Sequence, residues 1–525
     1  MKIKNILLLL FPLLFLLGYA QASQLNYYMV IPLSDELFPP PPWEPPVGEP
    51  ALHPNGVTVT CLGMSDLETF VLPETGKTYT TVYSTVDAAT YASTACTTNV
   101  TSLAYAFSGN VNFNEDISHW DTSNVTSMGG TFSGASAFDQ PIGSWDTSKV
   151  TNMIKTFDRA SVFNQPIGDW DTSNVKYIMN MFSNASVFNQ PIGDWDTSNL
   201  TSMSEMFRFA NAFNQPIGNW DTSNVTSISN MFSYAKAFNQ PIGIWNTSNV
   251  TVMSSTFNGA RAFNQPVGDW DTSKVTTMIG MFGGASAFNQ AIGDWNTMNV
   301  TNMGGMFSRA SAFNASVGNW NTSNATTMSN MFYGASAFNQ AIGDWNTMNV
   351  TDMGGMFAGA SVFNQPIGNW DTLNVTTMYN MFGQARAFNQ PIGNWNTSNV
   401  TTMGNMLSQA TAFNQDIGTW NTSQVSTMRS MFSMARAFNK PIGDWNTSKV
   451  TTMRDMFFYA DSFNQLIGNW NTSMVTDMNR MFYAATVFNQ DLSIWCVSNI
   501  GTKPTDFDRG TYKWVLPRPA WGTCP

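Results

Sequence analysis

A strict 25-residue period constrains this chain more than any other feature. Sixteen Trp residues follow one another at intervals of 25, from Trp120 to Trp495, and the residues between them repeat as well. Self-similarity at a period of about 20–50 residues is typical of solenoids, propellers and arrays. In such arrays each unit contacts only its neighbours. We therefore expect one array of tandem repeats over 99–495, not the three or four domains that 525 residues would otherwise suggest.

The interior of a unit predicts two kinds of backbone. Residues 175–185 place apolar side chains at the spacing of one helix face, after a DTSN stretch rich in helix-capping residues. Residues 188–195 contain Gly and Pro, which excludes a helix and suits a short strand. Identical strands one unit apart would stack as a parallel sheet. The expected fold is α/β, a right-handed leucine-rich-repeat-like solenoid of about sixteen strand–turn–helix units.

The segments outside the array predict export and capping. Residues 1–22 combine Lys2 and Lys4, an apolar run and an Ala20-Gln21-Ala22 cleavage site, which is the pattern of a secretory signal peptide. Residues 23–54 form a proline-rich linker. Residues 55–98, with strands expected at 57–60 and 78–82 and a helix at 86–93, form an N-terminal cap, and residues 496–525 form a C-terminal cap. We expect a secreted or cell-surface protein with no transmembrane segment in the mature chain.

Four cysteines flank the array and fit an oxidising compartment. Cys61 and Cys96 precede the repeats, and Cys496 and Cys524 follow them. Sixteen units stacked at ~4.8 Å would separate the two ends by roughly 75 Å, whereas a disulfide needs Cα atoms within about 7 Å. The expected disulfides are Cys61–Cys96 and Cys496–Cys524.

The composition argues against two functional classes. The net charge is −11 and only 11% of residues are charged, so no basic surface for nucleic acid is expected. The only histidines are His53 and His119, both outside the regular repeats. No unit brings a nucleophile together with a base, or paired carboxylates with histidine. We therefore expect no enzyme activity and no catalytic residues.

The repeat also resembles a known family. The stretch WDTSNVTSISNMFSYAKAFNQPIGIW at 220–245 is similar to the repeats of the BspA-like leucine-rich-repeat surface proteins of bacteria, and the ending DLSIWCVSNI resembles their terminal cap. The resemblance covers about 99–500. It implies a cell-surface or secreted solenoid with a role in adhesion, and it brings no catalytic residues. Met, Phe and Trp largely replace the leucines that name the repeat class.

Basic residues that interrupt the repeat are the candidate binding surface. They occur in different units at different exposed positions: Lys155, Arg159, Arg208, Lys236, Arg261, Arg309 and Arg386. An extracellular protein or glycan is the expected ligand, and cell-surface adhesion the expected function. The sequence leaves the oligomeric state open.

Two regular columns offer alternatives. One contains Asp121, Asp146 and Asp171, with Asn at the same place in other units. It could hold calcium along one edge, but interchange of Asp and Asn favours hydrogen bonds to turn amides. The other column contains Thr122, Thr147 and their successors. Regular Thr and Asn columns suit the alternative function, a structural or environmental surface protein that binds ice or crystalline polysaccharide.

Overall fold

The computed structural model describes residue 44 and residues 46–525. The predicted signal peptide and most of the predicted linker lie outside the described residues. Residues 46–525 belong to one compact unit. None of the helices in the described part is long and apolar enough to cross a membrane.

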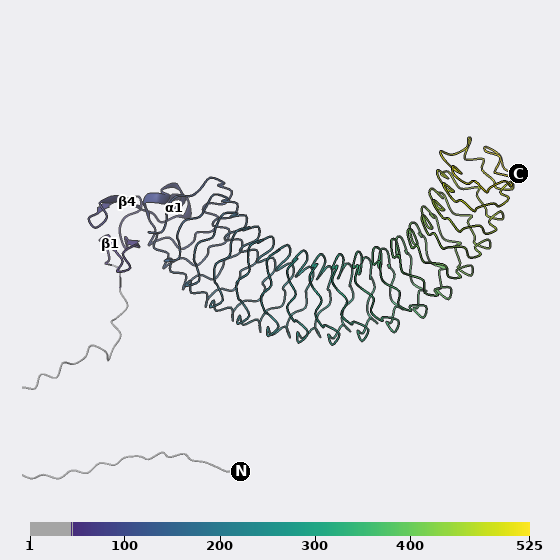
Figure 1. Ribbon diagram of the computed structural model, residues 1–525. Helices are drawn as coiled ribbons and strands as arrows, with labels where there is room; N and C mark the ends of the chain where they lie inside the picture. The colour runs from purple at the N-terminus through teal and green to yellow at the C-terminus, as the bar shows by residue number, and fades with distance from the viewer. Residues whose placement is uncertain (1–43, 45) are drawn as a thin grey trace, which may run out of the picture. The chain divides into compact units, whose positions relative to one another are not determined.

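The array is a solenoid whose coils stack side by side at a period of 25 residues (Figure 1). Single parallel β-bridges join equivalent residues of neighbouring coils, from Ser102 to Tyr177 and again from Ser202 to Asp477. This confirms the predicted solenoid of tandem repeats. The predicted right hand stays a prediction.

The predicted helix over 175–185 is wrong, because this half of the coil is a chain of overlapping turns. In the coil that begins at Val125, the N–H groups of Thr131 and Ser133 donate to carbonyls three residues back, those of Met128 and Gly130 (3.2 and 3.0 Å). The N–H groups that alternate with these point to the next coil, as in Phe132 N to Thr156 O at 2.9 Å. Alternate N–H groups leave the coil, so the i to i−4 pattern of an α-helix cannot form.

Residues with positive φ are a second reason why this half of the coil does not form a helix. Two residues of this half take positive φ in most coils, for example Gly130 at 66° and Gly134 at 78°, or Asn180 and Asn184 at 60°. Gly and Asn are the residues that adopt this region most readily. The apolar spacing that suggested a helix face is instead that of residues pointing inward from successive turns.

The predicted strand over 188–195 is also wrong. In the coil that contains it, this half consists of turns, with Phe188 N bonded to Ala185 O and Trp195 N to Ile192 O. The bridges lie in the other half of the coil, at residues such as Tyr177. We call 175–187 and its equivalents the edge half of a coil, and 188–199 and its equivalents the frame half.

Aromatic rows fill the core along the whole array. Equivalent rings stack on one another, and their spacing grows across the coil from 5.8 Å in the Phe282 row to 6.0 Å in the Phe288 row and 6.4 Å in the Trp295 row. Hydrogen-bonded bridges hold the edge half at ~4.8 Å. The spacings of the two halves differ, and the stack of coils curves (Figure 1).

The residues before the array form two small sheets and a short helix. Strands β1 (Ala51–Leu52) and β2 (Val59–Thr60) pair antiparallel, while β3 (Thr69–Leu72) pairs with β4 (Lys77–Thr81), which pairs parallel with β5 (Ala95–Cys96). Helix α1 (Thr85–Thr90) and the 3₁₀ turn η1 (Ala92–Thr94) lie between β4 and β5. The expected strands and helix therefore form, although the first strand is shorter than expected.

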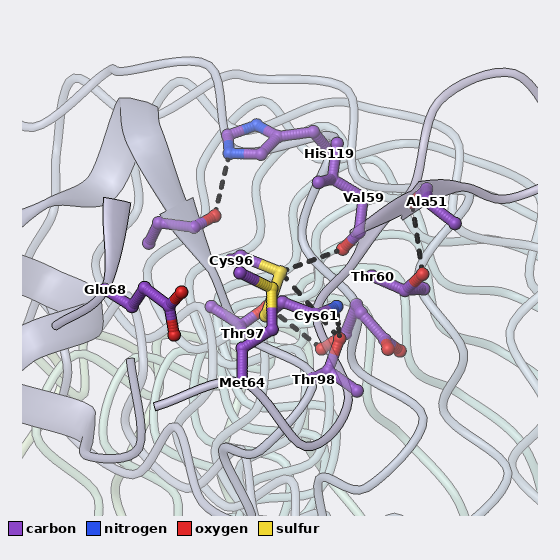
Figure 2. The surroundings of a disulfide bond; sticks show 12 residues. Ala51, Val59, Thr60, Cys61, Met64, Glu68, Cys96, Thr97, Thr98 and His119 are labelled. Carbon is purple, nitrogen blue, oxygen red and sulfur yellow. Dashed lines mark hydrogen bonds between the residues drawn. A yellow bond between two sulfur atoms is a disulfide. The ribbon is translucent and has the colours of Figure 1, made fainter. Parts of the chain in front are cut away.

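The Cys61–Cys96 disulfide joins the first of these sheets to the end of the second, as predicted (Figure 2). Next to it, His119 of the first coil is held from two sides: its Nε2 donates to Ala95 O at 3.0 Å and its carbonyl accepts from Val59 N at 2.9 Å. Burial lowers the pKa of His119 below its usual value, so the ring is neutral near pH 7.

The last coil is covered by rings that meet it edge-on. Trp514 contacts Phe482 and Phe488 at interplanar angles of 70° and 87°, whereas rings inside the array lie nearly parallel. The predicted Cys496–Cys524 disulfide closes this end. An edge-on ring presents no face on which another coil could stack.

Candidate binding edge

The two halves of a coil are held to their neighbours by different groups. In the edge half, backbone bonds to backbone, as in Phe307 N to Met331 O at 2.8 Å. In the frame half of the array, the bonds between coils run through side chains. Asn339 Oδ1 accepts from Asn364 N at 2.9 Å, and Trp345 Nε1 donates to Val317 O at 3.0 Å.

This difference decides which residues can vary. Frame-half side chains are bonding groups, and Trp and Phe recur there in every coil. Outward side chains of the edge half are less constrained, because the backbone already joins the coils; where a hydroxyl occurs, as at Ser286, which donates to Arg261 O at 3.4 Å, it adds to that joint. We call the positions equivalent to Glu205, Arg208, Phe209 and Asn211 the variable edge. Across coils they hold Gly, Ser, Asn, Tyr, Arg and other residues.

All seven basic residues singled out from the sequence lie on the variable edge: Lys155, Arg159, Arg208, Lys236, Arg261, Arg309 and Arg386. Arg208 pairs with Glu205 at 2.9 Å, and Arg159 lies 4.0 Å from Asp158. The other five make no ion pair within the part of the chain that the structure describes. Their roles as binding residues stay a prediction.

The structure brings two of the seven, Arg261 and Arg309, into one groove of about 720 Å³. Tyr234 and Tyr333 lie toward its two ends. Its remaining lining residues are Asn258, Gly259, Gly283, Gly284, Ser286, Ser308 and Asn330. None of these is an acid, a histidine or a cysteine, so the groove offers contacts for binding and no acid–base pair.

Sequence reasoning missed the tyrosines and glycines of this groove. The signal was present, because Gly259 and Gly284 occupy, in the next two units, the place that Tyr234 holds. A Cβ on Gly259 would lie 2.6 Å from Tyr234 Cδ1, so the glycine makes room for the ring. A smaller groove of about 260 Å³ continues beyond Arg309 and Tyr333, again over glycines, at Gly334, Gly359 and Gly383.

The side chains of the Asp column accept hydrogen bonds from backbone N–H groups within turns. Asp171 Oδ1 accepts from Ser173 N at 2.9 Å, and Asn246 makes the same bond to Ser248 N at 3.1 Å. The Ser198 hydroxyl and N–H also hold the pKa of Asp196 below its usual value. Among the described residues there is no group of three or more His, Cys, Asp or Glu side chains that could hold a metal ion. The turn interpretation therefore accounts for this column, including the interchange of Asp and Asn.

The Thr column singled out from the sequence cannot form an exposed surface. Thr122, Thr147 and Thr172 are buried, and Thr122 Oγ1 donates to Asp146 O of the next coil at 2.9 Å. The expectation that this column meets a periodic surface is wrong. Each hydroxyl instead satisfies a carbonyl that the frame half leaves without a backbone partner.

Comparisons with known proteins match the repeat and not an activity. The model of a family described as "Mycoplasma protein of unknown function, DUF285" matches at 80–190, 166–266, 239–345, 314–420, 338–443 and 409–512. No curated protein matches.

Two solved structures are similar at low identity. One is a plant peptide hormone receptor, RGFR1, in complex with RGF2, at 8% identity and a TM-score of 0.21, covering 70% of this chain and 71% of that one. The other is a leucine-rich repeat protein from Bacteroides ovatus, at 10% identity and a TM-score of 0.22, covering 81% of this chain and 100% of that one. The overlapping family matches run through most of the chain, which therefore belongs to the DUF285 family.

Proposed function

We propose that this protein is an exported, non-catalytic scaffold that binds an extracellular protein or glycan along its variable edge, in cell-surface adhesion. The observation that carries the proposal is that different groups join the coils in the two halves of each coil. Side chains of the frame half join the coils there, while in the edge half the backbone makes the joint, so its outward side chains can differ from coil to coil. The residues that differ between coils are therefore concentrated on the variable edge, where a ligand could contact them.

Export is part of the proposal and has separate support. Two disulfides are expected of an oxidising compartment, and residues 1–22 have the composition of a signal peptide. The domain limits (23–54 linker, 55–98 cap, 99–495 array and 496–525 cap) and the BspA-like resemblance belong to the proposal as well.

The test is binding of the full chain to arrays of matrix proteins and glycans, with calcium and with chelator. Blocks of coils are then exchanged within the chain, which keeps the frame and reorders the variable edge. We expect a calcium-independent signal that changes with the order of blocks. A signal indifferent to that order would remove the variable edge from the proposal, and a signal lost in chelator would return calcium to the Asp column.

A second candidate function rests on a different Thr column. Nine successive coils, from Thr201 to Thr401, carry outward Thr residues beside the bridge row. From Thr226 onward each hydroxyl donates to the preceding Thr carbonyl, for example Thr326 to Thr301 at 3.1 Å, which fixes its direction. A row of aligned hydroxyls suits ice or a crystalline polysaccharide. Thermal hysteresis and sedimentation with crystalline cellulose test it, and a null result in both assays would reject it.

A further inference from the structure

The groove between Tyr234 and Tyr333 combines an open floor with aromatic ends. Gly283 and Gly284 contribute only backbone to the floor. Tyr234 is 42% exposed and its ring stacks on Phe209 at a centroid distance of 4.7 Å. At the far end the Arg309 guanidinium lies 5.6 Å from the centre of the Tyr333 ring. The groove extends across the edge halves of several successive coils, so it suits an extended ligand.

Cations without counter-ions surround this groove. Arg261 and Arg309 line it, and Lys236 occupies the position of Arg261 one coil earlier. All three side chains are exposed and without an ion pair in the described part of the chain. The acids of the coils at 225–349 lie in the frame half, at Asp269, Asp271, Asp294 and Asp344. A chain of net charge −11 thus has a locally positive groove, which favours an anionic ligand.

The remaining contacts favour a sugar over a peptide. Ser308 and Asn330 line the groove with side chains that make no hydrogen bond inside the described structure, so they are available to ligand hydroxyls. The lining includes no aliphatic pocket for the apolar anchors by which peptides usually bind. Tyrosine rings offer flat apolar faces with a polar rim, which suit the C–H faces of a pyranose.

We propose that this groove is a binding site for an extended anionic oligosaccharide, bearing carboxylate or sulfate groups that Arg261 and Arg309 engage. The site rests on the proposed binding function of the variable edge and names the ligand class for one part of it. Guanidinium groups bind carboxylate and sulfate oxygens through paired N–H donors, so the spacing of the two arginines would set which charges along the chain are read.

The test measures binding of the full chain to four probes: polygalacturonate fragments, sulfated dextran, neutral dextran and poly-glutamate. Variants use residues that the array already holds at the same positions. Ser308→Tyr places in the groove the residue found one coil later at Tyr333, and Arg261→Ser introduces the Ser of the next coil. The two controls lie in the frame half. Lys440→Gln removes a cation and introduces the residue that most coils hold at that position, and Ser398→Leu adds a large side chain, the residue found one coil earlier at Leu373.

We expect an anionic sugar to bind with an affinity that falls with salt, and neutral dextran and poly-glutamate to bind far more weakly. Ser308→Tyr and Arg261→Ser should each lower the affinity about tenfold or more, and the two control variants should not. Equal or tighter binding of poly-glutamate, equal losses in the controls, or no binding of either anionic sugar would overturn the site. Array signals that depend on block order but survive Ser308→Tyr would reject this site while keeping the scaffold.

Discussion

The frame half and the edge half of a coil are similar in length and stack on the same neighbouring coils. Their sequences differ, because frame-half residues recur from coil to coil and outward edge-half residues vary. In the frame half, Gln365 Nε2 and Asn364 N both reach Asn339, and a changed side chain would break the joint between coils. In the edge half, the corresponding joints are backbone to backbone, so Arg309, Gly334 and Gln384 occupy equivalent places. A repeat can therefore vary where its backbone makes the hydrogen bonds, and must be constant where its side chains make them.

The largest effect is expected from removing a ring of the frame half. Trp320 is 3% exposed, stacks on Trp295 and Trp345 and donates from Nε1 to Ile292 O. Trp320→Ala should cost about 3–5 kcal/mol of unfolding free energy in chemical denaturation. Val362→Ala, at an exposed edge-half position where most coils already hold Ala, serves as the control and should stay within about 0.5 kcal/mol. Similar losses at the two sites would contradict the comparison.

The next largest effect is expected at a glycine that has no room for a side chain, because the following coil lies against it. A Cβ on Gly343 would lie 2.6 Å from the carbonyl oxygen of Pro366. Gly343→Ala should therefore force neighbouring coils apart and cost about 1–3 kcal/mol, measured by urea unfolding. Gly501→Ala is the matched control, because nothing lies within 4 Å of its added Cβ. A neutral Gly343→Ala would mean that the frame half yields more easily than its contacts indicate.

A third experiment removes one side-chain joint. Asn339→Leu leaves the Asn364 N–H without its acceptor, which should cost about 1–3 kcal/mol. Hydrogen exchange at Asn364 should rise more than exchange at Phe332, whose joint to Met356 is backbone to backbone at 2.9 Å. The column already contains Asp139, which accepts from Asn164 N at 2.9 Å, so Asn339→Asp should keep the bond. Equal exchange at both sites in Asn339→Leu would remove the distinction between the halves.

The smallest effect is expected on the variable edge, with the opposite sign. Gln384 has φ of 61°, a region that costs a side-chain-bearing residue about 1–2 kcal/mol. Gln384→Gly should stabilise the array by about 1 kcal/mol or less, because the greater freedom of unfolded glycine offsets part of the gain. Thermal unfolding measures it against Ala335→Gly, at a buried position without positive φ in the same segment of its coil, which should destabilise. A loss in both variants would contradict the left-handed assignment.

Particular residues show how far sequence reasoning reached. The Trp period predicted the solenoid, and the position of the cysteines relative to the array predicted both disulfides. The helix over 175–185 failed because inward-facing turns and one face of a helix share an apolar spacing. Gly and Asn at positions such as Gly130 and Asn180 could have corrected it, since both favour positive φ. The groove between Tyr234 and Tyr333 was out of reach, because it depends on side chains from coils far apart in sequence.

The sequence by itself determined the period, the number of coils, the inward side chains and the pairing of the cysteines, since each follows from spacing along one chain. Only the tertiary structure decided the backbone path and the division between frame and edge. Whether an N–H bonds within its coil or to the next depends on the neighbouring coil, which no single unit contains. The same dependence buried the Thr122 column and left the Thr326 column exposed, although both recur at the same period.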